Sequence, residues 1–187
     1  MKESQREFSL GNQFLVASPY MGDPRFHGAV IYLCEHNEQG ALGLVVNMPT
    51  DMVLGEILTQ LDLDGEARAE PVYYGGPVQT ERGFVLHTPD GRWQNSLAIS
   101  DDVSMTTSRD VLEAIAGDVG PQQFLMALGY AGWGAGQLET ELSGNAWLVC
   151  PASADILFQT PAVDRYQRVL DRLGVTLDQL SGPVGHA

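Results

Sequence analysis

Basic residues are scarce in this sequence, and lysine is nearly absent. The 187 residues include ten Lys and Arg against twenty-four Asp and Glu, which gives a formal net charge of −14. The single lysine is Lys2, and the one arginine cluster, within residues 165–172, is interleaved with Asp164 and Asp171. Binding to a phosphate backbone requires clustered Lys and Arg that replace counterions. The composition therefore argues against direct nucleic-acid binding and against an anionic membrane surface.

Long apolar runs are missing as well. The N-terminal residues contain no apolar core of a secretory signal. The apolar part of the uncharged stretch 119–138 is short and interrupted by glycines, whereas a membrane span needs about 20 residues. The two cysteines, Cys34 and Cys150, each lie in an apolar run, which is typical of reduced, buried thiols. We expect a cytoplasmic protein that does not enter a membrane.

The length and composition that remain are those of a globular domain. Hydrophobic residues make up 44% of the chain. A domain of this size buries roughly 70% of the surface that its unfolded chain exposes, which is enough for a proper core. No linker divides the sequence. We predict a single domain over residues 1–187, with flexible ends at 1–12 and 181–187.

Strand and helix patterns alternate in groups along this domain. Residues 29–36 and 41–47 form β-rich runs around the turn NEQG and predict a hairpin, and residues 83–87 and 92–100 around TPDG predict a second one. Further strands are predicted from the runs QFLVAS, PVYYG, FLMALGY and NAWLVC. Helices are predicted over 51–61, over 107–116 and after Thr160-Pro161. In the second, Thr107 and Asp110 are placed as a capping box. The apolar face of the first comprises Leu54, Ile57, Leu58 and Leu61, and that of the third comprises Val163, Tyr166, Leu170 and Leu173. This pattern favours an α+β fold with a mixed, largely antiparallel sheet and peripheral helices.

The most unusual stretch is LGYAGWGAGQLETEL, residues 128–142, which has four glycines around Trp133. A phosphate-binding loop is one reading, but the third glycine of G-x-G-x-x-G is missing and Glu139 occupies the first turn of the following helix, where a phosphate would bind. The favoured reading is a crowded turn, with Gly134 at positive φ, Trp133 buried with its N–H paired, and Gly136 beginning a short helix.

The same stretch resembles a signature of the YqgE/AlgH family of bacterial proteins. Other similar segments follow in order along the chain, namely MGDPRFHGAVIYLCEHNEQGALGLVVN, YGGPVQTERGFVLHTP, MTTSRDVLEAIA and NAWLVC. The resemblance implies a single compact α+β domain with a bifurcated or barrel-like sheet. The family carries the label of a transcriptional regulator, tied to alginate control in pseudomonads, without an agreed biochemical activity. Met48 departs from the family pattern, which usually has Arg or Lys there, so an anion contact at this position would be absent.

Residues that could support catalysis are few. Cys34, Glu35 and His36 are adjacent, and on a regular strand Cys34 and His36 would face the same side. A thiol or hydrolase-like enzyme would use Cys34, His36 or His87. A metal site would need His27, His36 and His87 to converge with an acid, and no known ligand spacing occurs. We therefore predict no metal and no cofactor, and we keep the enzyme as the alternative hypothesis.

A second group of polar residues lies beside glycine or proline turns. Asn47, Arg82 and Gln137 either stitch loops together or line a shallow pocket with Trp133 and Tyr130. With Glu35, His36 and His87 they form the candidate ligand or partner surface. The sequence favours a binding or regulatory module that acts on a protein or a small ligand, with any regulatory role on transcription being indirect.

Overall fold

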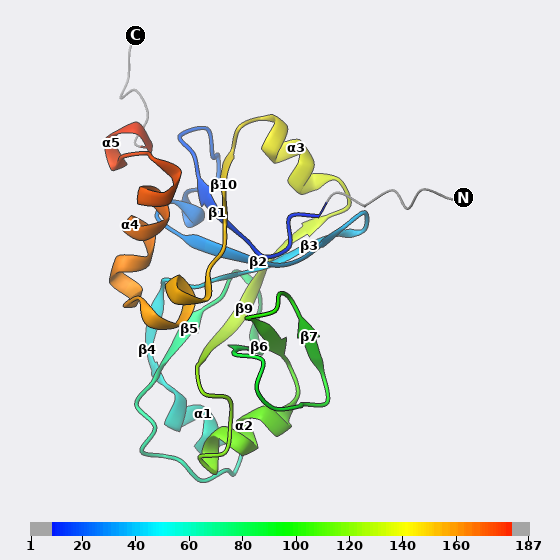
Figure 1. The fold of residues 1–187 in the computed structure, drawn as a ribbon, viewed down its shortest axis with the longest axis vertical. Coiled ribbons are helices and arrows are strands. Elements are labelled where there is room, and N and C mark those ends of the chain that lie inside the picture. The colour runs from blue at the N-terminus through cyan, green and yellow to red at the C-terminus, as the bar shows by residue number, and fades with distance from the viewer. Residues whose placement is uncertain (1–8, 181–187) are drawn as a thin grey trace, which may run out of the picture.

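One long strand, β9 (Phe124–Gly134), joins two groups of strands into one curled sheet (Figure 1). The computed structural model describes residues 9–180, and within them the sheet has ten strands in the order β10-β1-β2-β3-β9-β6-β8-β7, with β5 paired to β9 and β4 to β5. The other strands are β1 (Gln13–Ala17), β2 (Val30–Asn37), β3 (Gly40–Val45), β4 (Pro49–Val53), β5 (Pro71–Tyr74), β6 (Val78–His87), β7 (Ser96–Ala98), β8 (Ser104–Thr106) and β10 (Trp147–Pro151). The β5–β9 pair is parallel and the other pairs are antiparallel. The predicted α+β fold with a mixed, largely antiparallel sheet is confirmed.

The helices divide between two regions that share β9. The upper region of Figure 1 contains β10, β1, β2 and β3 with the helices α3 (Gln137–Ser143), α4 (Ala162–Leu173) and α5 (Leu177–Leu180). The lower region contains β5 to β8 with α1 (Leu54–Gln60) and α2 (Arg109–Ala116). Two short elements complete the chain, a 3-10 turn at Pro24–Phe26 and a π-helix at Asp155–Gln159. None of the helices within residues 9–180 is long and apolar enough to cross a membrane.

The glycine-rich stretch is a strand that changes partners. Residues 131–134 of β9 pair with β3, and residues 124–128 pair with β5 and β6. At the change, Gly129 has φ +78°, and a Cβ there would lie 2.3 Å from the Gly76 carbonyl oxygen. A Cβ on Gly76 would in turn lie 2.1 Å from the Tyr130 carbonyl carbon. The glycines therefore allow two backbones to touch, and the crowding in this stretch is at Gly129.

The prediction that Gly134 lies at positive φ in a crowded turn is wrong. Gly134 continues β9, is absent from the positive-φ glycines, and an added Cβ would meet only the Gln137 side chain, at 3.9 Å. The two other expectations for this stretch hold. Trp133 is 7% exposed and donates its Nε1–H to Glu141 at 2.7 Å. Gly136, at φ +74°, precedes α3, whose first turn contains Glu139.

The first predicted hairpin is confirmed and the second is wrong. Strands β2 and β3 pair around residues 38–39. Strand β6 does not pair with β7, because β8 lies between them and pairs with both. The segment after the TPDG turn is held elsewhere, since the backbone N–H groups of Gln94 and Asn95 donate to Asp110 and Ser108 at the start of α2. A turn sequence that is typical of a hairpin therefore begins a longer loop, which leads to an edge strand that does not pair with β6.

The three predicted helices exist, with local differences. The first begins at Leu54, because residues 49–53 form β4 instead. The cap of α2 is Ser108 and not Thr107, and the Asp110 carboxylate accepts the Gln94 N–H and the Ser108 hydroxyl instead of closing a capping box.

The third helix, α4, also differs from its predicted face and cap. Pro161 is the cap residue, and the Thr160 hydroxyl donates to the Asp155 carbonyl. Val163, predicted on the apolar face, is 85% exposed, whereas Arg165 is buried. Arg165 donates to the carbonyls of Ile156, Thr160 and Val46 and thereby anchors the helix to the sheet.

The core consists of three apolar clusters. One lies between the sheet and α4, and another lies under α3 and contains Trp133 and Trp147. The third belongs to the lower region and packs α1 and α2 on β6 and β9. Its buried residues include Leu54, Leu58, Val85, Val111, Ile115 and Met126.

Candidate functional site

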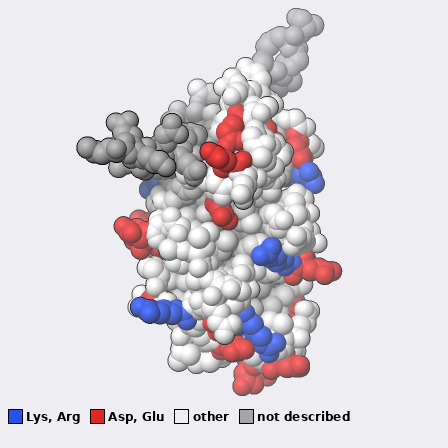
Figure 2. Space-filling model, turned by 90° about the vertical axis from the view of Figure 1, so that its right-hand side faces the viewer, with Lys and Arg blue, Asp and Glu red and all other residues white. Residues whose placement is uncertain are grey.

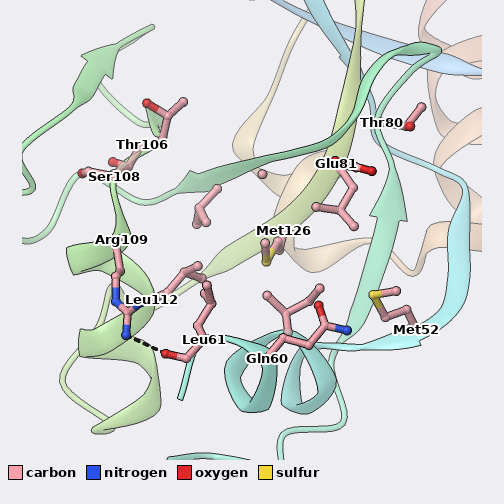
Figure 3. A pocket seen from close by; sticks show the side chains of 15 residues that line it. Met52, Gln60, Leu61, Thr80, Glu81, Thr106, Ser108, Arg109, Leu112 and Met126 are labelled. Carbon is pink, nitrogen blue, oxygen red and sulfur yellow. Dashed lines mark hydrogen bonds between the residues drawn. The ribbon is translucent and has the colours of Figure 1, made fainter. Parts of the chain in front are cut away.

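A cleft opens between α1 and α2 over the outer face of β6 and β9 (Figure 3). Its volume is about 500 Å³. The apolar lining consists of Met52, Ile57, Leu61, Val85, Leu112, Met126 and Leu128. The polar lining consists of Gln60, Thr80, Glu81, Thr106, Thr107, Ser108 and Arg109. This size and this mixture are those of small-molecule sites, in which a few polar groups orient a ligand on an apolar floor.

The sequence opens this cleft through one residue without a side chain. Gly83 lies on β6 in the floor, at a φ that is not positive. A Cβ there would meet only the flexible Cε of Met126, at 3.0 Å, and the Cδ2 of Leu128, at 3.8 Å. Met126 is unbranched and adapts its shape readily. The floor can therefore accommodate groups of different outline.

Thr106 lines one end of the cleft and belongs to a row of hydroxyl groups that continues to Ser96, outside the lining. The strand register aligns Val85, Thr106 and Ser96 across β6, β8 and β7, so that their side chains share one face. The Oγ atoms of Ser96 and Thr106 are 2.6 Å apart. Thr106 Oγ1 is in turn 2.7 Å from Nε2 of His87. We call the Ser96 and Thr106 side chains the hydroxyl row.

His87 lies behind this row and is 1% exposed. Its Nδ1 is 2.6 Å from the carbonyl oxygen of Thr88. Burial lowers the pKa of His87 below its ordinary value, and the Thr88 carbonyl and nearby Asp90 only partly oppose that shift. The imidazole is therefore neutral at physiological pH, and it orients Thr106 from behind the cleft wall.

The charged residues at the cleft differ in how they are engaged. Arg109 points along α2 toward α1, where its Nη2 donates to the Leu61 carbonyl at 2.6 Å (Figure 3). Its Nε donates to Glu113 at 3.2 Å. Glu81 lies at the rim and is exposed. The arginine thus joins the two helices, and the glutamate faces solvent and the cleft mouth.

Other predicted site residues lie away from this cleft. Glu35 and Trp133 line a shallow groove over the β2–β3 hairpin together with Tyr130. Arg82 lines a separate depression, and its guanidinium carbon lies 5.1 Å from the ring centre of Phe84. The structure brings Glu35, Trp133 and Tyr130 together, and it places Arg82 and His87 in other surroundings.

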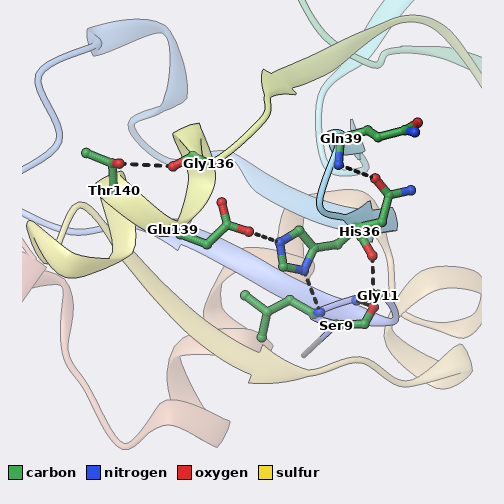
Figure 4. Close-up of polar contacts among 9 residues, drawn as sticks. Ser9, Gly11, His36, Gln39, Gly136, Glu139 and Thr140 are labelled. Carbon is green, nitrogen blue, oxygen red and sulfur yellow. Dashed lines mark hydrogen bonds and ion pairs between the residues drawn. The ribbon is translucent and has the colours of Figure 1, made fainter. Parts of the chain in front are cut away.

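His36 ties three segments of the upper region together (Figure 4). Its Nδ1 accepts the Leu10 N–H at 2.9 Å, and its Nε2 contacts the Glu139 carboxylate of α3. The hydrogen bond from His36 holds the pKa of Glu139 below its ordinary value.

Residues 1–8 and 181–187, which make up most of the predicted flexible ends, lie outside the described residues. Leu10 itself is held by this bond.

Cys34 and His36 do not share a face, contrary to the regular-strand expectation. The β2–β3 register shifts between Leu33 and Glu35, and this bulge reverses the alternation that follows. Cys34 packs into the cluster under α4, whereas His36 turns toward α3. Burial, and next the nearby Glu35, raise the pKa of the Cys34 thiol. The geometry gives Cys34 no imidazole partner from His36.

The remaining predicted residues stitch backbone segments together. Asn47 accepts the Val30 N–H and donates to the Gly28 carbonyl, each at 2.8 Å. Gln137 accepts the Gly134 N–H at 3.0 Å. Met48, where the family pattern has a basic residue, packs against the apolar cluster under α3.

Apart from His87 behind the wall, none of the predicted site residues is part of the cleft. Gly83 and Thr106, which line it, are far apart in sequence and meet only through the pairing of β6 and β8. The one sequence pattern that indicated part of the cleft was the apolar face of residues 51–61, because α1 forms one of its walls. Among the described residues, no group of three or more His, Cys, Asp or Glu is arranged to hold a metal ion.

Comparison with known proteins finds relatives over the whole length. A family model described as AlgH-like matches residues 14–178. A UPF0301 protein of Thioalkalivibrio sulfidiphilus is 56% identical over 178 residues, which cover 94% of this chain and 96% of the relative. A UPF0301 protein of Hahella chejuensis is 54% identical and covers 96% of this chain and 97% of its own.

Two solved structures share the fold. The solution structure of the AlgH protein from Pseudomonas aeruginosa is 48% identical, with a TM-score of 0.79 and full coverage of both chains. A protein from Corynebacterium diphtheriae is 24% identical, with a TM-score of 0.70 over 90% of this chain and 89% of its own, and it supports the fold alone.

Proposed function

We propose that this protein, which belongs to the AlgH-like family, is a cytoplasmic binding module that takes a small organic ligand in the cleft between α1 and α2. The observation that carries the proposal is the cleft itself. It has an apolar floor that Gly83 keeps open, and a polar end at which a buried histidine fixes the Thr106 hydroxyl group. Pockets of this volume that combine an apolar floor with a few fixed polar groups are the usual form of small-molecule sites.

A thiol enzyme is less well supported. The nucleophile of such an enzyme is a thiolate, which requires an exposed site and a lowered pKa. Burial raises the pKa of both Cys34 and Cys150, and Arg172 only partly opposes that effect at Cys150. A catalytic use of the cleft would instead depend on His87, the member of the enzyme hypothesis that lies beside it.

A regulatory role would follow from ligand binding and not from direct contact with DNA. Figure 2 shows Lys and Arg isolated from one another on the face that it presents, beside acidic residues. With a net charge of −14 the chain has little to offer a phosphate backbone. We expect fluorescence anisotropy with promoter duplexes across a salt series to detect no tight binding. Sub-micromolar affinity with a steep salt dependence would contradict this.

The binding proposal is tested by filling the cleft. Gly83→Leu places a side chain in the floor, where its Cβ meets only the ends of Met126 and Leu128. Gly134→Leu is the matched control, because it is also a strand glycine, in open space and away from the cleft. Both variants should unfold at a urea concentration close to that of the wild type.

The readout is binding of octan-1-ol by isothermal titration calorimetry, together with native mass spectrometry of protein purified from its own cells. We expect wild type and Gly134→Leu to bind the alcohol and to retain any co-purified molecule, and Gly83→Leu to lose both. Equal binding by all three proteins would show that the ligand lies elsewhere and would overturn the proposal.

A further inference from the structure

Strand β6 directs the backbone groups of one residue to an open edge beside the cleft. Successive residues of a strand direct their N–H and C=O groups to opposite sides. The Thr88 N–H donates to the Gln123 carbonyl, so Thr88 and the alternate residues before it face β9. Gly83, Val85 and His87 therefore face the other way, toward β8. The N–H and C=O groups of Gly83 point away from β9.

Strand β8 is too short to cover Gly83. The β6–β8 register pairs Val85 with Thr106, and its continuation would place Ser108 opposite Gly83. However, β8 ends at Thr106, and α2 begins after Ser108. Within residues 9–180, no backbone hydrogen bond other than those of the strand ladders and helices reaches Gly83. One backbone donor and one acceptor are therefore open on this side, and such an edge is a template for pairing with another extended chain.

The space beside this edge is the cleft. Gly83 and Ser108 both line it, and so does Leu128, which is level with Gly83 on β9. Residues directly opposite each other in an antiparallel pair have their side chains on the same face. A residue paired with Gly83 would therefore place its side chain on the apolar floor, near Leu128 and Met126, in the room that the missing side chain of Gly83 leaves.

We infer that the cleft recognises a secondary amide of the peptide type, in which one extended residue with an apolar side chain pairs with Gly83. The inference rests on the proposed function and specifies the class of ligand. The ligand residue donates its N–H to the Gly83 carbonyl and accepts the Gly83 N–H at its own carbonyl, as in a hydrogen-bonded antiparallel pair. In β-strand addition, such main-chain bonds give affinity and the pockets for side chains give specificity.

Other head groups match this edge less well. An ammonium group only donates and a carboxylate only accepts, so each leaves one of the two Gly83 groups without a partner. A carboxylate would in addition meet Glu81 in the lining and the negative field of a chain with a net charge of −14. An uncharged amide supplies one donor and one acceptor and avoids this repulsion.

The test compares two ligands of the same outline by isothermal titration calorimetry. One is acetyl-leucine N-methylamide, and the other is its ester analogue, in which an oxygen atom replaces the leucine N–H. We expect the ester analogue to bind about tenfold more weakly, because it leaves the Gly83 carbonyl without a donor and sets a second oxygen atom against it. Octan-1-ol, which reports on the apolar floor, is measured beside them.

A longer ligand distinguishes the two sources of such an amide. A peptide chain and a small N-acyl compound both present it, and a blocked Ala-Leu-Ala tripeptide is compared with the leucine amide. Tighter binding of the tripeptide would identify a peptide segment that continues along β6. Weaker binding would identify a single-residue amide that the ends of the cleft enclose. Either result requires that the ester analogue of the leucine amide binds less tightly.

Two variants at one position locate the amide. Gly83→Ala keeps the backbone N–H, whereas Gly83→Pro removes it. This N–H lies outside the β6–β9 ladder, and strand positions of that kind tolerate proline. Urea midpoints show whether both variants are folded. We expect the ratio of leucine-amide affinity to octan-1-ol affinity to be several-fold lower in Gly83→Pro than in Gly83→Ala.

A second measurement needs no variant. In heteronuclear NMR spectra of the wild type, the Gly83 amide proton should move downfield when the leucine amide is added, because it gains an acceptor, and should move less with octan-1-ol. The Gly134 amide, which already donates to Gln137 and lies outside the cleft, is the reference and should stay in place.

The failures are distinguishable. If octan-1-ol binds and Gly83→Leu abolishes its binding, but the leucine amide binds no more tightly than its ester analogue, the amide inference is wrong and the binding module stands. If the amide is preferred but neither the Gly83→Pro ratio nor the Gly83 amide proton changes, the assigned edge is wrong and the inference falls. If neither the alcohol nor the amide binds, both proposals fail.

Discussion

The upper and lower regions share a strand but use their buried histidines differently. In the upper region His36 ties the Leu10 backbone to Glu139 of α3. In the lower region His87 contacts the Thr106 hydroxyl group at the end of an open cleft. The upper sheet is covered on both faces by apolar clusters, whereas the lower cluster leaves room between α1 and α2. A buried histidine therefore holds separate segments together in one region and shapes a candidate site in the other.

The largest expected effect is at the junction of the two regions. Gly129→Ala places a side chain at φ +78° and 2.3 Å from the Gly76 carbonyl oxygen. Because backbone has to move, we expect a loss above about 4 kcal/mol in unfolding free energy, which only a few mechanisms produce. Gly134→Ala, in open space on the same strand, should stay within about 0.5 kcal/mol. Urea unfolding followed by circular dichroism measures both, and similar midpoints for the two variants would refute the close-contact junction.

A second prediction contrasts a sealed cluster with an open one. Trp133→Ala removes a ring that packs against Trp147 at 5.9 Å between ring centres and donates to Glu141. We expect it to lower the unfolding free energy by about 3 to 5 kcal/mol. Leu112→Ala, beside the cleft, should cost about 2 kcal/mol, the low end for such a change, because the space joins an existing opening. If Leu112→Ala costs as much as Trp133→Ala in the same urea titration, the lower region is as tightly sealed as the upper one.

A third prediction separates the two histidine sites by pH. The pKa of His87 is lowered in the folded state, so below its ordinary value of 6.5 the unfolded chain binds a proton that the folded chain refuses. Stability from this site is therefore complete above that pH and is lost as pH falls below it. Glu139 has a lowered pKa from an ordinary 4.5, so its contribution is lost only in stronger acid.

The measurement is the urea midpoint from about pH 7.5 down to about pH 4, the range in which carboxylates and histidines titrate. His87→Gln should flatten the decline that begins near 6.5, and Glu139→Gln should flatten only the part below 4.5. His36→Gln removes the tether to Leu10, and it should lower stability by about 1 to 3 kcal/mol through the unpaired groups that it leaves. An unchanged pH profile for His87→Gln would mean that folding does not lower the pKa of His87.

The smallest expected effect is at the cysteines, which lie in the closed upper region. Burial raises the pKa of both thiols, and Cys34 is 4% exposed. Brief iodoacetamide treatment of the folded protein should leave the intact mass unchanged, and both thiols should react in urea. Rapid single labelling at Cys34 would identify a reactive thiolate and revive the thiol-enzyme alternative.

Features that depend on neighbouring residues could be predicted from the sequence, and features that depend on distant residues could not. The β2–β3 hairpin and the apolar face of α1 depend on neighbouring residues, and local patterns predict both. The insertion of β8 between β6 and β7 depends on how the segment after residue 88 is held by α2, which no local turn signal encodes.

The candidate site shows the same limit. His87 was singled out as a titratable residue, but its role follows from Thr106 and Ser96, which reach it through strand register. The bulge after Leu33 separated Cys34 from His36 by reversing the alternation of side chains. In both places the strand register, which the whole sheet determines, sets which side chains meet.

The double membership of β9 also governs how the molecule opens. Amides within residues 126–128 lie between β5 on one side and β6 on the other, so their hydrogen bonds cannot break unless the lower sheet comes apart. The same strand continues into the upper sheet through β3. Partial opening of one region therefore strains the other, and we regard the chain as a single cooperative folding unit in which these amides exchange with solvent last. A molecule held over Met126 would slow that exchange far beyond the atoms it touches.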